Sequence, residues 1–167
     1  HNYESFKSNI YGDSSRIKMR YRWYGDIEDS NKGNFEIKFK RNLYGWKKRF
    51  DVKGLNLKEK KNWKFFTNLI NSDLPDKEKL LFKFNSNPKI INQYSRDYFI
   101  SSDKKLRITM DKNHVIYDQR YFSYPNFNKK TFHQKSLVME FKFDRKDRLK
   151  IDKLMKYIPM RSSRNSK

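Results

Sequence analysis

The sequence contains no cysteine, which excludes disulfide bonds and thiolate metal sites and fits a reducing compartment. Only 5 Gly and 4 Pro interrupt its 167 residues, and this scarcity, together with the many aromatic residues, argues against disorder. No run of residues approaches the roughly 18 apolar positions of a membrane-spanning helix. The chain also lacks a P-loop, a G-x-G-x-x-G and a G-x-S-x-G motif, so the NTPase, Rossmann and hydrolase sites built on them are unsupported.

Acidic residues are few relative to basic ones. Lys and Arg number 40 against 19 Asp and Glu, a formal net charge of +21. A field of that sign attracts nucleic acid, phosphorylated metabolites, polyphosphate or acidic membrane, and charge alone does not choose among them. The 14 Phe, 11 Tyr and 3 Trp supply much of the surface that can be buried, and the length fits one domain over residues 1–167.

Two neighbouring segments, residues 16–25 and 35–40, alternate basic with apolar residues. Successive side chains of an extended strand point to opposite faces, so each segment predicts a strand with a cationic face and an apolar, largely aromatic face. The cations placed on one face by this parity are Lys18, Arg20, Arg22, Lys38 and Lys40, and Glu36 is the acid among them. Two such strands side by side would hold a polyanion.

The other elements follow from periodicity and turn signals. Further strands are predicted over residues 46–50, 90–100, 106–111, 115–117 and 136–144, and helices over 57–70, 76–84 and 146–157. The third strand adds Lys47 and Arg49 to the cationic face, the strand over 106–111 adds Arg107, and the last strand adds Glu140 and Lys142. The predicted class is α+β, mainly antiparallel β, with helices packed outside.

Two arrangements of these strands remain open. An open sheet would leave its cations in solvent, where their repulsion is screened. A closed barrel would turn them toward one lumen suited to phosphate oxygens, because Arg offers bidentate donors and Lys a point charge. Glu140 and Glu36 would be the anions inside, each holding Mg²⁺ or Mn²⁺ or offsetting a neighbouring lysine.

Other chemistry has less support. His114 and His133 are isolated, without the partner spacing of a zinc site. A nucleic-acid module would place stacking aromatics beside its cations. Tyr21, Trp23 and Phe35 lie instead on the opposite faces of their strands, which counts against nucleic acid.

Six segments, taken in order, resemble a known family. They are 20–25 (RYRWYG), 35–40 (FEIKFK), 94–96 (YSR), 106–111 (LRITMD), 138–142 (VMEFK) and 164–167 (RNSK). This order is similar to that of the vacuolar transporter chaperone (VTC) domain, the polyphosphate-polymerase-like branch of the triphosphate tunnel metalloenzymes of the CYTH superfamily. The resemblance implies a closed, tunnel-like antiparallel β-barrel of about eight strands.

The resemblance also implies roles for single residues. Phosphates would be bound by Arg20, Arg22, Lys38, Lys40, Arg96 and Arg107, of which Arg20, Arg22, Lys38 and Arg107 would be catalytic. Tyr94 would bind near the nucleotide end, Glu140 would carry the metal, and Arg164, Ser166 and Lys167 would match a terminal K-x-S-K motif with Arg in its first place. Parity alone adds Lys18 and Lys142, and Lys47 or Arg49 on the third strand.

One departure from the family concerns its first strand, which bears another tunnel lysine and normally precedes a segment like 2–15. No such strand precedes this segment in the sequence, so we expect the domain over residues 1–167 to lack its N-terminal strand. Eukaryotic relatives carry membrane and phosphate-sensing domains that do not appear here, and the resemblance therefore implies a stand-alone cytoplasmic protein, as in bacteria.

Three functions follow from these patterns. The first is metal-dependent transfer of the terminal phosphate of ATP to a polyphosphate chain, with Mn²⁺ or Mg²⁺ at Glu140. The second is hydrolysis of tri- or polyphosphate or of a nucleoside triphosphate, against which the excess of cations over carboxylates counts. The third is a non-catalytic module that binds polyphosphate, RNA or acidic lipid.

Overall fold

The computed structural model describes residues 11, 14–42, 44–128, 130–132 and 137–158. Their contacts divide into two compact units. Unit 1 holds the described residues up to Ile90 together with Asp118–Phe127, and unit 2 holds Ile91–Tyr117 and the described residues from Asn128 onward. The single domain expected over residues 1–167 stays a prediction.

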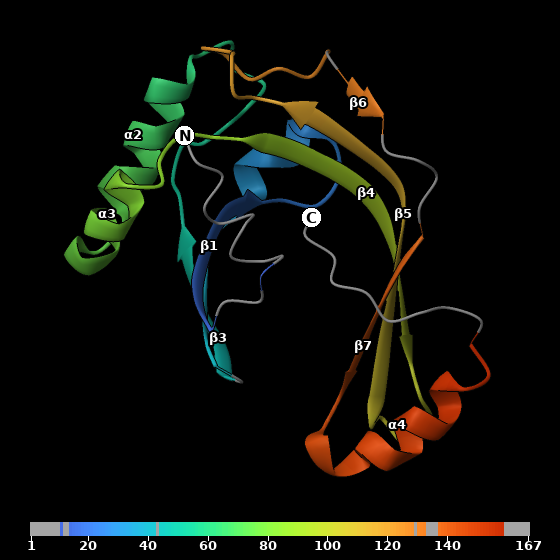
Figure 1. Cartoon of the computed structure of the whole chain (residues 1–167). Coiled ribbons are helices and arrows are strands. Elements are labelled where there is room, and N and C mark those ends of the chain that lie inside the picture. Colours follow the sequence, from blue (N-terminus) through green and yellow to red (C-terminus); the bar gives the residue numbers. More distant parts are fainter. Residues whose placement is uncertain (1–10, 12–13, 43, 129, 133–136, 159–167) are drawn as a thin grey trace. The chain divides into compact units, whose positions relative to one another are not determined.

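Unit 1 contains a three-stranded antiparallel sheet in the order β1 (Ser15–Arg22), β2 (Asn34–Arg41), β3 (Tyr44–Asp51), shown in Figure 1. A 3-10 helix, η1 (Ile27–Lys32), lies between β1 and β2. Residues directly opposite each other on paired strands share a face. The register places Lys18, Lys38 and Lys47 in one cross-strand row. The predicted segregation of cations from apolar residues is therefore confirmed for this sheet.

The apolar face of this sheet packs against two helices, α2 (Trp63–Asp73) and α3 (Asp76–Lys83), which Figure 1 shows beside it. Phe35 of β2 meets Phe82 of α3 edge to face, with ring centroids 5.3 Å apart. The buried core comprises Phe35, Ile37, Val52, Leu55, Leu57, Phe66, Ile70, Leu74 and Phe82. Burial of this area is the main favourable term in folding the unit.

The first helix begins later than the sequence pattern predicts. The expected range was 57–70, whereas α2 starts at Trp63 and runs to Asp73. Asn62 explains the start, because its side-chain oxygen accepts the backbone N–H of Phe65 at 2.9 Å and so caps the helix. Leu57 is still part of the core, but it lies in the preceding turns. Helix α3 agrees with the predicted range 76–84 to within one residue.

Unit 2 contains a four-stranded sheet. The strand β5 (Leu106–Asp118) pairs with β4 (Ile90–Ile100) and, along its length, with β7 (Val138–Phe143) and then β6 (Lys130–Phe132). The turn predicted at Asn113 is wrong, because the two strands expected around it form one continuous strand. Asn113 has φ +57°, a left-handed conformation accommodated without breaking β5. After β7 come a short 3-10 helix, η2 (Arg145–Asp147), and α4 (Arg148–Met155).

The closed barrel of about eight strands is wrong. The described strands form a three-stranded and a four-stranded sheet, and neither closes on itself. Within the described residues β1 and β3 each pair with β2, so the first sheet keeps two edges. Alternation along a strand fixes which face a residue takes, but it carries no information on which strands become neighbours, and closure depends on the neighbours.

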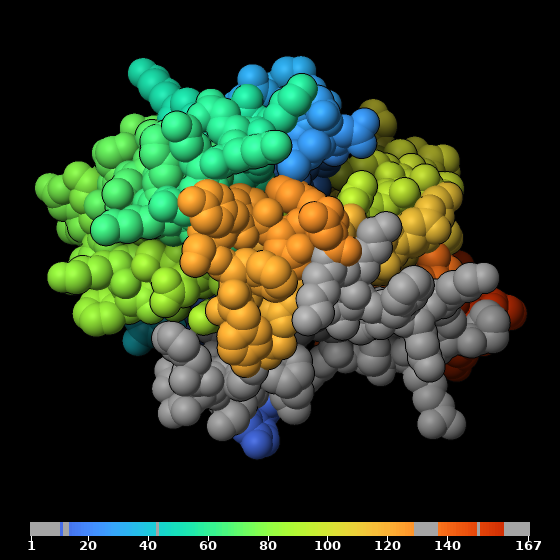
Figure 2. Space-filling model, turned by 90° about the horizontal axis from the view of Figure 1, so that it is seen from above, coloured from blue at the N-terminus to red at the C-terminus, as the bar shows by residue number. Residues whose placement is uncertain are grey.

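A tightly bonded loop completes unit 1. The buried side chain of Gln119 donates to the carbonyl of Asn126 and accepts its N–H, both at 2.7 Å. The backbone N–H of Trp63 donates to the carbonyl of Ser123 at 2.8 Å, which ties the loop to the start of α2. Figure 2 shows this loop, in orange, at the surface beside the green segment around residue 60.

Candidate functional site

One face of the β1–β2–β3 sheet carries a dense set of basic side chains. This surface, called the cationic face below, comprises Arg16, Lys18, Arg20, Arg22, Lys38, Lys40, Lys47 and Arg49. The opposite face of the same strands packs on α2 and α3, so burial of the apolar residues presents the cations on the other side. Unit 1 therefore presents the positively charged surface that the alternation of basic and apolar residues predicts.

The centre of the cationic face is a row of three lysines. Lys18, Lys38 and Lys47 lie directly opposite one another on β1, β2 and β3. Like charges at directly opposite positions destabilise a sheet. Burial, followed by the charges of Arg16 and Arg20, lowers the pKa of Lys18 from its usual 10.5. An anion bound to this row would relieve that repulsion.

The adjacent row holds a single acid between two arginines. Glu36 is only 2% exposed. Its Oε2 accepts Arg20 Nη2 at 2.6 Å and Nε at 2.8 Å, and its Oε1 accepts Arg49 Nε at 2.9 Å. Lys47 Nζ lies 3.6 Å from the same Oε1. Of the two roles expected for a carboxylate on this face, offsetting neighbouring cations is the one the geometry shows for Glu36.

The charge state of Glu36 follows from these contacts. Burial alone would raise the pKa of its carboxyl, but the hydrogen bond and charge of Arg20, the hydrogen bond of Arg49 and the charge of Lys47 outweigh it and lower the pKa to about 2. Glu36 is therefore ionised at physiological pH. Three of its neighbours share one negative charge, so the face as a whole stays strongly positive.

In unit 2 the predicted residues lie on one face of the second sheet. Arg96 on β4 donates from Nε and Nη2 to the two carboxylate oxygens of Asp111 on β5, at 2.5 and 2.7 Å. Its guanidinium carbon lies 5.2 Å from the Tyr94 ring centroid and 5.9 Å from that of Tyr98. Asp111 is buried, with 1% exposure. The fork between Arg96 and Asp111 thus holds the guanidinium between two aromatic rings.

The same face includes the predicted metal ligand. Glu140 on β7 is directly opposite Thr109, and Lys142 is opposite Arg107. Lys142 Nζ lies 3.7 Å from Glu140 Oε1, and both side chains are about half exposed. In the part of the chain that the structure describes, no three His, Cys, Asp or Glu residues form a metal-binding group. A lone accessible carboxylate nevertheless suits Mg²⁺, which proteins bind through one or two carboxylates with water and substrate phosphates.

The comparisons with known proteins place the chain in a family. The VTC domain matches residues 1–167, the whole sequence. The chain belongs to the VTC domain family. No curated protein and no solved structure matches it.

The structure of this VTC domain distributes the predicted residues over two sheets. Arg20, Arg22, Lys38 and their neighbours lie on the sheet of unit 1, whereas Arg96, Arg107 and Glu140 lie on that of unit 2. The single lumen expected for all of them depended on the closed barrel, which the two sheets contradict. Arg164, Ser166, Lys167 and His133 lie outside the described residues.

Sequence reasoning missed how the arginines are held. The sequence pattern predicts Asp111 only as the last residue of a strand, whereas the structure shows it as the bidentate partner of Arg96. The signal was present in the parity, because Asp111 shares a face with Arg107 and Thr109. An acid on a basic face predicts an arginine partner, as Glu36 also shows.

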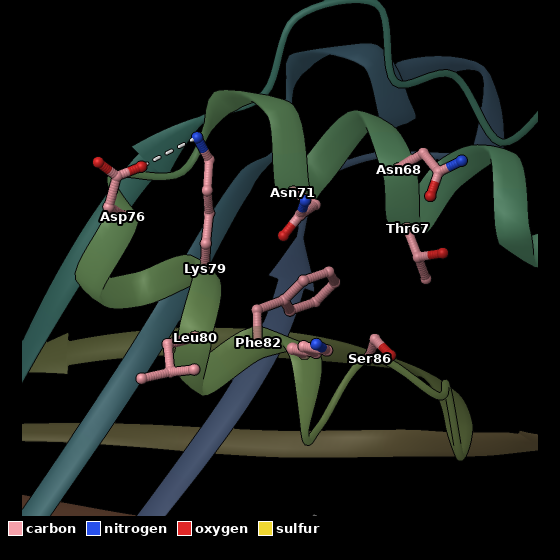
Figure 3. Close-up of a pocket in the computed structure, with 9 residues that line it drawn as sticks. Thr67, Asn68, Asn71, Asp76, Lys79, Leu80, Phe82 and Ser86 are labelled. Atoms are coloured by element: carbon pink, nitrogen blue, oxygen red, sulfur yellow. Dashed lines mark hydrogen bonds and ion pairs between the residues drawn. The ribbon is translucent and has the colours of Figure 1, made fainter.

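A hollow between α2 and α3 is a separate feature of this VTC domain. Its volume is about 530 Å³, and it is lined by Thr67, Asn68, Asn71, Asp76, Lys79, Leu80, Phe82, Lys83 and Ser86. Figure 3 shows the ion pair between Lys79 and Asp76 at its rim, with a nitrogen–oxygen distance of 3.3 Å. None of the predicted site residues lines the hollow, so it belongs to the helical layer and not to the cationic face. None of the helices that the structure describes could span a membrane.

Proposed function

We propose that this VTC domain binds a polyphosphate chain on the cationic face and transfers the terminal phosphate of ATP to it. The observation that carries the proposal is the row Lys18, Lys38, Lys47 beside the Arg20–Glu36–Arg49 cluster. Three ammonium groups directly opposite one another repel, and an anion that bridges them would reduce that repulsion. A chain of phosphates matches such a surface because each unit brings its own charge.

The proposed transfer requires no side-chain nucleophile and no covalent intermediate with the protein. A terminal phosphate oxygen of the chain attacks the γ-phosphorus of ATP, the bond to the bridging oxygen breaks, and ADP leaves with that oxygen. The protein positions the two polyanions and neutralises the charge of the transition state. On the cationic face of unit 1, Arg20, Arg22 and Lys38 are the proposed catalytic residues, and Lys40 and Arg49 are proposed to hold phosphates that do not react. On the sheet of unit 2, Arg107 is the proposed catalytic residue, and Arg96 and Lys142 are the proposed phosphate ligands.

Glu140 is the proposed metal ligand. Bound Mn²⁺ or Mg²⁺ would neutralise charge on the phosphates. The half-exposed carboxylate of Glu140 offers the metal one oxygen ligand, and substrate phosphates and water would complete the coordination. The ammonium group of Lys142 lies 3.7 Å from that carboxylate. When the metal binds, Lys142 would either move away from Glu140 or bind the same phosphates as the metal.

The decisive experiment incubates the protein with ATP and Mn²⁺ and separates orthophosphate from long-chain product. Long-chain product supports the proposal, and orthophosphate alone would assign the hydrolytic alternative. Arg20→Ala and Arg107→Ala are expected to abolish turnover, while Lys64→Ala, an exposed position on α2, retains it. Normal turnover in both arginine variants would overturn the proposed site.

Non-catalytic binding of a phosphate polyanion is the second candidate. The cationic face favours it directly, because a surface of that charge binds polyanions whether or not chemistry follows. It predicts binding that weakens steeply with salt, needs no metal and yields neither product.

A further inference from the structure

The only carboxylate in the central two rows of the cationic face is Glu36, and it is nearly inaccessible. Two arginines from different strands converge on it, Arg20 from β1 and Arg49 from β3. Arg20 donates through Nε and Nη2 and Arg49 through Nε, and a guanidinium group has five N–H donors, so each arginine keeps further donors for a ligand. The contacts therefore fix the direction of each side chain without using all of its hydrogen-bonding capacity.

We infer that Glu36 is a positioning residue for polyphosphate binding: it holds the guanidinium groups of Arg20 and Arg49 side by side in the geometry that phosphate oxygens require. This inference rests on the proposed binding of polyphosphate at the cationic face. It gives a role to an acidic residue on a surface proposed to bind anions, where a carboxylate would by itself repel the ligand.

The energetic reason is the rotamer freedom of arginine. An arginine on an exposed strand face has many rotamers, and a ligand that must order it loses affinity. The side chains of Arg20 and Arg49 are 37% and 57% exposed, so little packing restricts them. Glu36 orders both through hydrogen bonds of 2.6 to 2.9 Å before any ligand arrives.

Positioning and charge compensation predict opposite results for one substitution. Glu36→Gln removes a negative charge from the cationic face. If Glu36 only compensates charge, the variant binds polyphosphate more tightly than the parent protein does. If it positions the arginines, the variant binds more weakly, by about 2- to 10-fold for each arginine that binding must then order.

Glu78 provides a matched control. It is also a buried glutamate, 5% exposed, and it accepts Lys48 Nζ of β3 at 2.5 Å, but it lies on the opposite side of the sheet, where α3 covers the apolar face. Glu78→Gln therefore changes the net charge of the protein by the same amount without touching the cationic face. We expect it to leave polyphosphate affinity unchanged or to increase it slightly.

The experiment measures the affinity of the whole protein for long-chain sodium polyphosphate by calorimetry, without ATP or metal, so that no turnover intervenes. The variants are Glu36→Gln, Glu36→Asp, Glu78→Gln, Arg20→Ala and Arg49→Ala, each checked for folding by circular dichroism. Glu36→Asp keeps the charge but shortens the reach, so it too should weaken binding. It also keeps the test decisive if Glu36→Gln does not fold.

The outcomes distinguish the positioning role of Glu36 from the proposed binding of polyphosphate on the cationic face. Weaker binding in Glu36→Gln and Glu36→Asp, with Glu78→Gln unaffected, supports the positioning role. If the arginine variants bind weakly but Glu36→Gln binds more tightly or unchanged, the positioning role is wrong and the binding surface stands. If the arginine variants bind polyphosphate normally, the proposed binding surface itself is wrong.

Discussion

Both sheets bury one carboxylate against an arginine. Glu36 is 2% exposed against Arg20, and Asp111 is 1% exposed against Arg96. A buried carboxylate is tolerated when charge-assisted hydrogen bonds replace its water, and the arginine fork supplies two at once. At each of these sites the hydrogen bonds to the acid fix the direction of a basic side chain.

The pKa of Glu36 predicts how stability responds to acid. Because the pKa is about 2 in the folded protein against an ordinary 4.5, the unfolded chain binds the proton first as the pH falls. The stabilisation is fully present above pH 4.5 and is lost between pH 4.5 and about 2. We expect Glu36→Gln to unfold with a shallower pH dependence in that window, measured by urea denaturation. A slope identical to that of the parent protein would contradict this account.

Lys18 predicts the response of binding to alkali. Its pKa is lowered by burial and by Arg16 and Arg20, so it loses its charge before an ordinary lysine does as the pH rises toward 10.5. Polyphosphate affinity should therefore fall in that alkaline range as the central row loses an ammonium. Lys18→Arg keeps the charge and should move the fall to higher pH. The measurement is a polyphosphate titration at several alkaline pH values, with Lys53→Arg at an exposed position as the control. If Lys18 lies outside the binding surface, Lys18→Arg and Lys53→Arg will show the same dependence of affinity on pH.

At the scale of the elements, the sequence predicted the strands of unit 1 and their faces because alternation is a local property. It missed the ends and interruptions of elements, which depend on single side chains. The capping bond of Asn62 sets the start of α2 at Trp63, and the left-handed conformation of Asn113 lets β5 continue where a turn was expected. Neither effect changes the hydrophobic period from which the elements were read.

The cap of α2 predicts a measurable loss of stability. Asn62→Ala removes the acceptor of the Phe65 N–H, and we expect it to lower the free energy of unfolding by roughly 0.5–2 kcal/mol. Asn68, exposed on the same helix, is the control, because Asn68→Ala removes no cap and raises helix propensity. Urea denaturation of the two variants should give changes of opposite sign. Equal changes would mean that Asn62 does not act as a cap.

The conformation of Asn113 makes a second prediction for an element. At φ +57° a β-branched residue is strained, so Asn113→Val should cost roughly 1–2 kcal/mol of stability. Asn113→Gly has no such penalty from Cβ and should cost less, although it loses the long contact to Ser95 Oγ at 3.5 Å. Thermal unfolding of the pair measures the difference. A valine variant as stable as the glycine variant would show that β5 adopts another conformation there.

At the scale of the whole molecule, membership of the VTC domain family and the strongly basic charge were both readable from the sequence, whereas the arrangement of the sheets was not. Motifs in order identify a family because each is a local string. Strand neighbours arise from long-range pairing, which a single sequence does not encode locally. The candidate site was therefore predictable as a set of residues, Arg20 and Lys38 among them, but not as an enclosed channel.

A net charge of +21 predicts that polyanions stabilise the fold. A ligand that binds only the folded state raises its stability by RT ln(1 + [L]/Kd), about 2.7 kcal/mol at a hundredfold excess over Kd. We expect long-chain polyphosphate to raise the melting temperature by several degrees at low salt. The increase should largely disappear at 1 M salt, where the screening length is about 3 Å. Orthophosphate at equal phosphorus concentration is the control, because it lacks the linked charges that can span the row Lys18, Lys38, Lys47. If polyphosphate raised the melting temperature equally at 1 M salt, or if orthophosphate raised it by the same amount, the cationic face would not be the cause of the stabilisation.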